Sequence, residues 1–198
     1  MIVVTGATGK LGRLVVAELL KRVPAKDIVA AVRTPSKAAD LAARGVQVRQ
    51  ADYTSPASLA AAFKGADKVL LISASEVGQR AAQHTNAINA AKTAGVKHLA
   101  YTSVLRAETS GLGLAEEHKA TEQAIRASGL PFTFLRHGWY MENYSENLGP
   151  VLQHGAVLGS AKDGRVAAAT RADFAAAAAV VMSCTGHEVK IYELAGAG

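Results

Sequence analysis

The sequence contains few of the residues that build disulfide scaffolds, cysteine-rich metal centres or membrane spans. A single cysteine, Cys184, excludes an internal disulfide and a cysteine-cluster metal site, and it fits a reducing compartment. The longest apolar run, residues 174–182, is far shorter than the roughly 20 residues that span a membrane. No signal-peptide pattern is visible, because the apolar start has no basic region and leads directly into glycines. We therefore expect a cytoplasmic protein without a membrane partner.

Basic residues are in excess, but they are not clustered. The 198 residues include 22 Lys and Arg against 16 Asp and Glu, a net charge of +6. Proteins that bind nucleic acid concentrate such residues on one face or in a run, and this chain has no basic tract. We expect no nucleic-acid partner. A small anionic ligand with several phosphates fits the excess equally well.

Several catalytic motifs are also missing. The sequence has no G-x-S-x-G turn of a hydrolase and no G-x-x-x-x-G-K-[ST] nucleotide loop. None of its six histidines forms an H-E-x-x-H pair or another close metal pair, so we expect no metal. No tyrosine is followed four residues later by lysine. The chain thus lacks the Tyr-x-x-x-Lys pair with which ordinary short-chain dehydrogenases transfer a proton to a carbonyl oxygen.

Short apolar runs alternate with longer amphipathic segments. Several runs are apolar throughout, which is typical of strands buried on both faces of a parallel sheet. The pattern predicts strands at 2–5, 28–32, 46–50, 68–72, 98–102, 132–136 and 190–194, and helices at 11–20, 35–43, 56–63, 78–94, 115–128 and 170–183. Residues 138–150 look like a loop. The rhythm predicts an α/β fold: a doubly wound parallel sheet forming one Rossmann domain over residues 1–198.

The strongest chemical signal is a glycine-rich turn between the first predicted strand and the first helix. Gly6 permits a tight turn, Gly9 lets backbone N–H groups approach a pyrophosphate, and Gly12 lets the helix pack close to the strand. The spacing is G-x-x-G-x-x-G, not the commoner G-x-G-x-x-G. The alternative is a turn with no ligand. Its place in the first βα unit favours a dinucleotide site.

The end of the second predicted strand selects the cofactor. NAD-specific sites usually place an Asp or Glu there, whereas this chain has Arg33, with Lys37 four residues later. A guanidinium pairs well with a 2′-phosphate, so the sequence predicts NADPH. Asp52 ends the third predicted strand, where it could accept from the adenine amine or be an ordinary turn residue.

A family resemblance joins these motifs. Residues 5–12 and 32–37 resemble the NmrA-like branch of the atypical short-chain dehydrogenases. Residues 72–80, 136–144 and 169–173 are similar to the bacterial NAD(P)H:quinone oxidoreductases of that branch, with the triphenylmethane dye reductases as close relatives. The similarity covers nearly the whole chain. Related chains continue into a further, largely helical segment that helps wall the substrate pocket, so we expect this C-terminal segment to be truncated here.

The resemblance implies a cofactor site made of four stretches. The pyrophosphate would be held by Gly6, Ala7, Thr8, Gly9, Lys10 and Leu11, and the 2′-phosphate by Arg33. The ribose and nicotinamide would lie along Ser73, Ala74 and Ser75. The nicotinamide would be flanked by His137, Gly138, Trp139, Tyr140, Met141 and Glu142, with Arg171 nearby.

A quinone acceptor suits a chain without the Tyr-x-x-x-Lys pair. A hydroquinone anion has a phenol-like pKa of about 10, so water or buffer can protonate it. The protein then needs mainly to stack a flat ring, for which Trp139, Tyr140 and Tyr144 are candidates unless they pack the loop against the core. His118, four residues before Glu122, could be a general acid, but a surface or half-buried histidine is favoured.

We therefore expect an NADPH-dependent enzyme that passes hydride to a small-molecule quinone. Two alternatives stay open: a non-catalytic NADP(H)-binding redox sensor, as in the NmrA type, and a reductase of another flat electrophile such as a dye cation. The catalytic residue, the particular acceptor and the oligomeric state, monomer or homodimer, are left open. Cys184 is expected to be inert packing in a helical, apolar setting.

Overall fold

The computed structural model describes residues 1–146, 148–156 and 162–197 and contains one seven-stranded parallel sheet. The strand order β3-β2-β1-β4-β5-β6-β7 reverses direction between β1 and β4, which is the doubly wound arrangement that the sequence predicts. Every neighbouring pair is parallel. The strands are β1 (Ile2–Thr5), β2 (Ile28–Val32), β3 (Gln47–Gln50), β4 (Lys68–Leu71), β5 (His98–Val104), β6 (Phe132–His137) and β7 (Lys190–Leu194).

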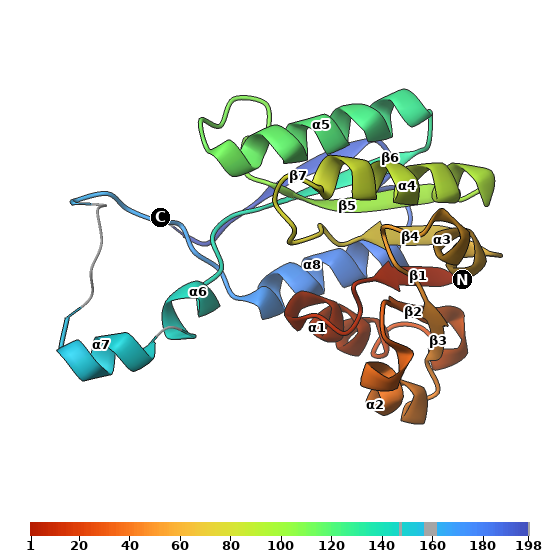
Figure 1. Ribbon diagram of the computed structural model, residues 1–198, viewed down its shortest axis with the longest axis horizontal. Coiled ribbons are helices and arrows are strands. Elements are labelled where there is room, and N and C mark those ends of the chain that lie inside the picture. Colours follow the sequence, from red (N-terminus) through yellow and green to blue (C-terminus); the bar gives the residue numbers. More distant parts are fainter. Residues whose placement is uncertain (147, 157–161, 198) are drawn as a thin grey trace.

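Helices cover both faces of the sheet (Figure 1). One face carries α1 (Lys10–Leu19), the short α2 (Ala39–Ala43) and α8 (Arg171–Ser183). The other carries α3 (Pro56–Phe63), α4 (Arg80–Thr93) and α5 (Gly113–Ser128). Successive strand residues point to opposite faces, so Val3 packs under α3 and α4 while Val4 packs against α1 and α8. This double burial explains why the strands read as continuous apolar runs.

The prediction of a loop at residues 138–150 is wrong in part, because this segment contains two short helices. They are α6 (Glu142–Ser145) and α7 (Leu148–His154), and they form an arm that projects away from the sheet (Figure 1). Gly149 and Pro150 argue against a helix in the sequence, but proline is tolerated in the first turn, where its missing N–H needs no partner. Contacts with α8, described below, hold α6.

Thr170 and Asp173 form a capping box at the start of α8. Asp173 N donates to Thr170 Oγ1 at 3.2 Å, and Thr170 N donates to Asp173 Oδ2 at 3.1 Å. The other end of this helix corrects an expectation. Because α8 stops at Ser183, Cys184 lies beyond the helix as an exposed free thiol and is not packed in the core. Among the helices of the described residues, none is both long and apolar enough to cross a membrane.

Candidate functional site

A cavity of about 1070 Å³ opens at the carboxyl ends of the strands, beside the crossover between β1 and β4. This is where ligands bind in doubly wound folds. Fifteen of the eighteen cofactor residues expected from the sequence line it, and Ala7, Met141 and Glu142 do not. The cavity also has walls that the sequence did not single out, which include Tyr53, Arg80, Thr102, Ser103, Leu112, Leu114, Arg165 and Val166.

The glycine turn forms one end of the cavity. Gly6 has φ +58°, and Gly9 N donates to the Gly6 carbonyl at 2.9 Å. A Cβ on Gly12 would lie 2.3 Å from that carbonyl oxygen and 2.8 Å from Ala7 Cα. Gly12 is thus required for close approach of α1 to the turn itself, and not to the strand as expected. The turn and the α1 N-terminus line the cavity and fit a pyrophosphate, while Ala7 is buried beneath them.

Arg33 and Asp52 lie where β2 and β3 reach the cavity. The Arg33 side chain is 72% exposed, and its Nη1 makes a weak contact with Glu76 Oε1 at 3.5 Å. Asp52 Oδ1 accepts from Thr54 N at 2.9 Å and from Thr54 Oγ1 at 2.7 Å. These bonds hold the pKa of Asp52 below its ordinary value. The carboxylate therefore has the turn role that the sequence left open, while it still borders the cavity.

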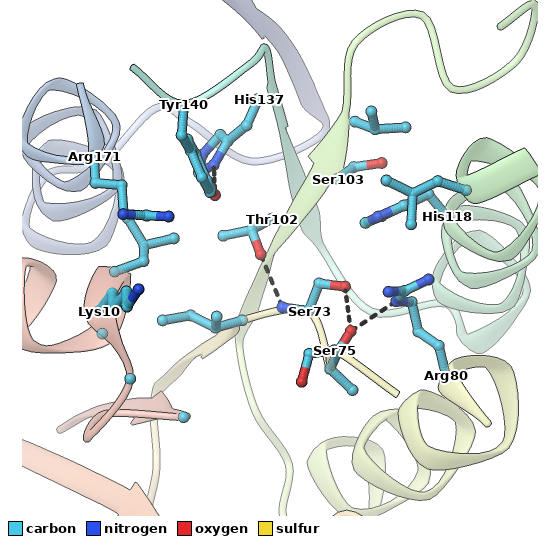
Figure 2. A pocket seen from close by; sticks show the side chains of 18 of the residues that line it. Lys10, Ser73, Ser75, Arg80, Thr102, Ser103, His118, His137, Tyr140 and Arg171 are labelled. Carbon is cyan, nitrogen blue, oxygen red and sulfur yellow. Dashed lines mark hydrogen bonds between the residues drawn. The ribbon is translucent and has the colours of Figure 1, made fainter. Parts of the chain in front are cut away.

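The segment after β4 is held by buried polar groups (Figure 2). Ser73 N donates to Thr102 Oγ1 at 2.9 Å. Ala74 N donates to His84 Nε2 at 2.9 Å, and the Ala74 carbonyl accepts from Arg80 Nε at 2.8 Å. Burial and the nearby Arg80 charge lower the pKa of His84 to about 3, so its ring is a neutral acceptor at neutral pH. A rigid polar wall results, with Ser73, Ala74 and Ser75 facing the cavity.

Arg80 is held in turn by α5. Its Nη1 lies 2.5 Å from Glu117 Oε2, and Glu117 Oε1 accepts from Gly78 N at 2.9 Å. The Arg80 side chain is almost fully buried, so this ion pair is largely shielded from solvent. Arg80 belongs to the family-like segment 72–80, but its burial depends on α5 and is invisible in the local sequence.

His137, at the end of β6, forms the opposite wall. Its ring stacks on Phe174 with centroids 4.4 Å apart, and its Nδ1 lies 3.1 Å from Tyr140 OH. Burial lowers the pKa of His137 to about 3. Its Nε2 is buried without a partner in the described part of the chain.

Arg171 joins this wall to the α6 arm. Its guanidinium carbon lies 4.9 Å over the Tyr140 ring, and its Nη1 donates to Glu146 Oε1 at 2.6 Å. Arg171 N donates to both Glu142 carboxylate oxygens, at 2.9 and 3.1 Å. Glu142 therefore caps the positive end of α8 and does not face the cavity.

The three candidate aromatic residues have different environments. Tyr140 packs edge-on against Phe174, with ring centroids 5.3 Å apart, and still lines the cavity. Trp139 also lines it and is 51% exposed. Tyr144 is exposed on α6 and does not border the cavity. Trp139 is thus the aromatic side chain with free surface for a planar ligand.

His118 is not the surface or half-buried residue that the sequence favoured. It is buried, it lines the cavity, and its Nδ1 lies 2.7 Å from Tyr101 OH. Glu122, its expected neighbour on the same face of α5, is bound instead by Arg136, whose Nη2 lies 2.6 Å from Glu122 Oε2. The spacing placed both residues on one face correctly, but their partners come from β5 and β6.

Comparison with known proteins identifies the family of this chain. Residues 6–183 match the family described as NAD(P)H-binding. Quinone oxidoreductase 2 of Escherichia coli K12 is 60% identical over 196 residues, which are 99% of this chain and 68% of that protein. The NAD(P)H azoreductase of Xenophilus azovorans is 34% identical over 201 residues, again 99% of this chain and 68% of the relative.

Comparison with solved structures supports the same family. The E. coli NADPH-dependent quinone oxidoreductase QOR2 complexed with NADPH superposes with a TM-score of 0.96 at 60% identity, over 99% of this chain and 69% of that one. The Citrobacter triphenylmethane reductase complexed with NADP(H) superposes with a TM-score of 0.95 at 46% identity, over 99% and 70%. These relatives are longer than this chain, as the resemblance implied. The chain belongs to the NAD(P)H-binding, NmrA-like family.

Proposed function

We propose that this chain is an NADPH-dependent oxidoreductase that transfers hydride to a quinone. The observation that carries the proposal is the single cavity that joins the glycine turn and Arg33 to the wall formed by His137 and Trp139. It offers a pyrophosphate cradle, a cation for a 2′-phosphate and an exposed aromatic face in one continuous space. The identity with the E. coli quinone oxidoreductase supports the same acceptor class.

The proposed division of labour follows the cavity from end to end. Gly6, Thr8, Gly9, Lys10 and Leu11 hold the pyrophosphate, Arg33 the 2′-phosphate, and Asp52 borders the adenine. NADPH, when bound, supplies the hydride. The residues that flank the nicotinamide are Ser73, Ala74, Ser75, His137, Gly138, Trp139, Tyr140 and Arg171. Three expected residues act indirectly: Ala7 supports the turn, and Met141 and Glu142 position the α6 arm.

The absence of a Tyr-x-x-x-Lys pair agrees with this acceptor. Hydride addition to a ketone produces a strongly basic alkoxide, which forms readily only when a general acid donates a proton as the hydride arrives. A hydroquinone anion, whose conjugate acid has a pKa of about 10, is stable enough to form first and then take its proton from water. The cavity then acts chiefly by orienting two planar groups against each other. Trp139 is the proposed stacking surface for the quinone.

The test is NADPH oxidation with a panel of simple quinones, together with direct titration of the cofactor. We expect catalytic loss of the NADPH absorbance that depends on the quinone. Binding of NADPH without turnover, with similar affinities for NADPH and NADP⁺, would support the redox-sensor alternative instead. Turnover with a triphenylmethane dye but not with quinones would favour the dye reductase, which the 46% identity to the Citrobacter enzyme makes the second candidate.

We further propose that residues 1–198 act as one domain on small molecules in the cytoplasm. The described residues share one sheet, to which β7 near the chain end contributes the last strand. Light scattering of the purified chain, with and without NADPH, distinguishes a monomer from a homodimer.

A further inference from the structure

We propose that His118 donates a hydrogen bond to the acceptor oxygen on which negative charge develops during reduction. This inference rests on the proposed quinone reductase function and assigns a catalytic side chain to it. His118 lies on α5, outside the four stretches that the resemblance assigned to the cofactor. It enters the cavity from the α5 side, next to Ser103 and Arg80 (Figure 2).

His118 shares a buried hydrogen bond with Tyr101, on which we base the assignment of its tautomer. Tyr101 is fully buried, and burial raises the pKa of its hydroxyl, so the hydroxyl keeps its proton. Burial and the Arg80 charge lower the pKa of His118 to about 4, so the ring is neutral at neutral pH. Tyr101 OH lies 2.7 Å from His118 Nδ1, and we assign the hydroxyl as donor and Nδ1 as acceptor. This assignment places the imidazole proton on Nε2.

Nε2 is the nitrogen available to a ligand. No hydrogen bond joins it to another group among the described residues. Unlike His137 Nε2, it is not one of the nitrogens that are both shielded from solvent and without a partner. His118 lies beside Ser103 and Arg80, and the cavity lining also includes Leu105, Leu112 and Leu114. In a cavity with apolar as well as polar walls, an N–H donor is a strong orienting contact for a carbonyl oxygen, because water competes less well there.

Reduction of the quinone does not require His118 to lose a proton. When a hydride adds to a quinone, the ring gains two electrons and one hydrogen, and one oxygen becomes an anion. The Nε2–H bond points at that oxygen and stabilises the charge, while the nearby Arg80 cation adds a favourable field. Solvent water then supplies the proton that completes the hydroquinone. His118 acts as a neutral electrophile, since an imidazolate would be too costly to form.

Two substitutions separate donation from packing. His118→Phe keeps a planar ring but removes the donor, and His118→Gln keeps an N–H group at similar reach. His154→Gln, on an exposed face of α7 outside the cavity, is the matched control. The readouts are kcat and KM with benzoquinone and, without cofactor, the spectrum of bound para-nitrophenol, which distinguishes phenol from phenolate.

For His118→Phe we expect kcat to fall about ten- to hundredfold, the loss for one hydrogen bond to a charged group, with little change in the NADPH dissociation constant. His118→Gln should keep most of the activity. Wild-type protein should bind nitrophenol more as phenolate than His118→Phe does. Unchanged kcat and unchanged phenolate fraction in His118→Phe, or an equal loss in both variants, would overturn the proposal. If the wild type reduces no quinone, the proposed function is wrong. The nitrophenol spectra still test whether His118 donates a hydrogen bond to a phenolate oxygen.

Discussion

Arg33 and Glu76 meet at the cavity with opposite charges, and their contact is weak. The closest atoms are 3.5 Å apart, and both side chains keep much of their surface exposed. A solvated pair of this kind contributes little to stability. The Arg33 guanidinium is therefore available to an incoming phosphate, whereas the Glu76 carboxylate opposes one.

Replacing Arg33 tests how the cavity distinguishes its cofactors. We expect Arg33→Ala to weaken NADPH binding by about 1.5–3 kcal/mol, the loss for a hydrogen bond to a charged group, and to leave NADH binding nearly unchanged. Glu76→Gln should strengthen NADPH binding, since it removes a like charge. Calorimetric titration with both cofactors measures this, with the exposed Arg44→Ala as control. Equal losses for NADPH and NADH in Arg33→Ala would show that Arg33 does not read the phosphate.

A single methyl group at position 12 should disrupt the glycine turn. In Gly12→Ala the new Cβ would lie 2.3 Å from the Gly6 carbonyl, so α1 or the turn has to move. We expect loss of measurable NADPH binding with the sheet retained, monitored by titration and by circular dichroism. Gly149→Ala, where the added Cβ meets no atom within 4 Å, is the matched control. Normal NADPH affinity in Gly12→Ala would contradict the close approach.

At the scale of elements, a buried ion network joins β5, β6 and α5. Arg136 on β6 is bound by Glu122 on α5, and Ser103 on β5 donates to Glu122 Oε1 at 2.6 Å. The side chains of Arg136 and Glu122 are 6% and 2% exposed. This pairing fixes the face that α5 presents to the sheet, and with it the position of His118.

Removing one member of this pair should cost far more than removing both. We expect Glu122→Ala to lower the free energy of unfolding by about 3–5 kcal/mol, because Arg136 is left buried without its main counter-charge. The double variant Glu122→Leu, Arg136→Met should regain much of that loss. Urea unfolding measures the series, with Lys21→Ala, which breaks an exposed pair with Glu18, as control. A single-variant loss no larger than that of the control would refute the network's role.

At the scale of the whole molecule, buried neutral histidines make stability depend on pH. Burial holds the pKa of His84, His118 and His137 at about 3, 4 and 3 in the folded chain, against about 6.5 when unfolded. Below pH 6.5 these histidines bind protons in the unfolded chain but stay neutral in the folded chain. The free energy of unfolding therefore falls as the pH falls. The full contribution is present above pH 6.5 and is lost towards the folded pKa values.

We therefore expect a lower free energy of unfolding at about pH 5.5 than at about pH 7.5, by urea titration at constant ionic strength. Asp67, whose pKa is lowered to about 2 by Lys97 and the N-terminus, titrates below this range and does not mask the effect. His118→Gln should reduce the difference between the two pH values. Equal stability at both would mean that these histidines are already protonated in the folded chain.

The sheet and the glycine turn could be predicted from local sequence patterns. Strands buried on both faces are apolar throughout, and a turn of this kind needs glycine at fixed spacing, so both features are written in a few consecutive residues. That is why the predicted strand 2–5 has the same bounds as β1, and why Gly6 takes the expected tight turn.

Contacts between distant segments determine which side chains outside the predicted stretches reach the cavity, and which predicted ones are turned away from it. His118 is buried there because β5 supplies Tyr101, and Glu122 faces Arg136 because α5 lies across β6. Glu142 is drawn away to cap α8, which begins 29 residues later in the chain. Local patterns record the period of an element and its turns, whereas burial and hydrogen-bond partners depend on segments that meet only when the chain has folded.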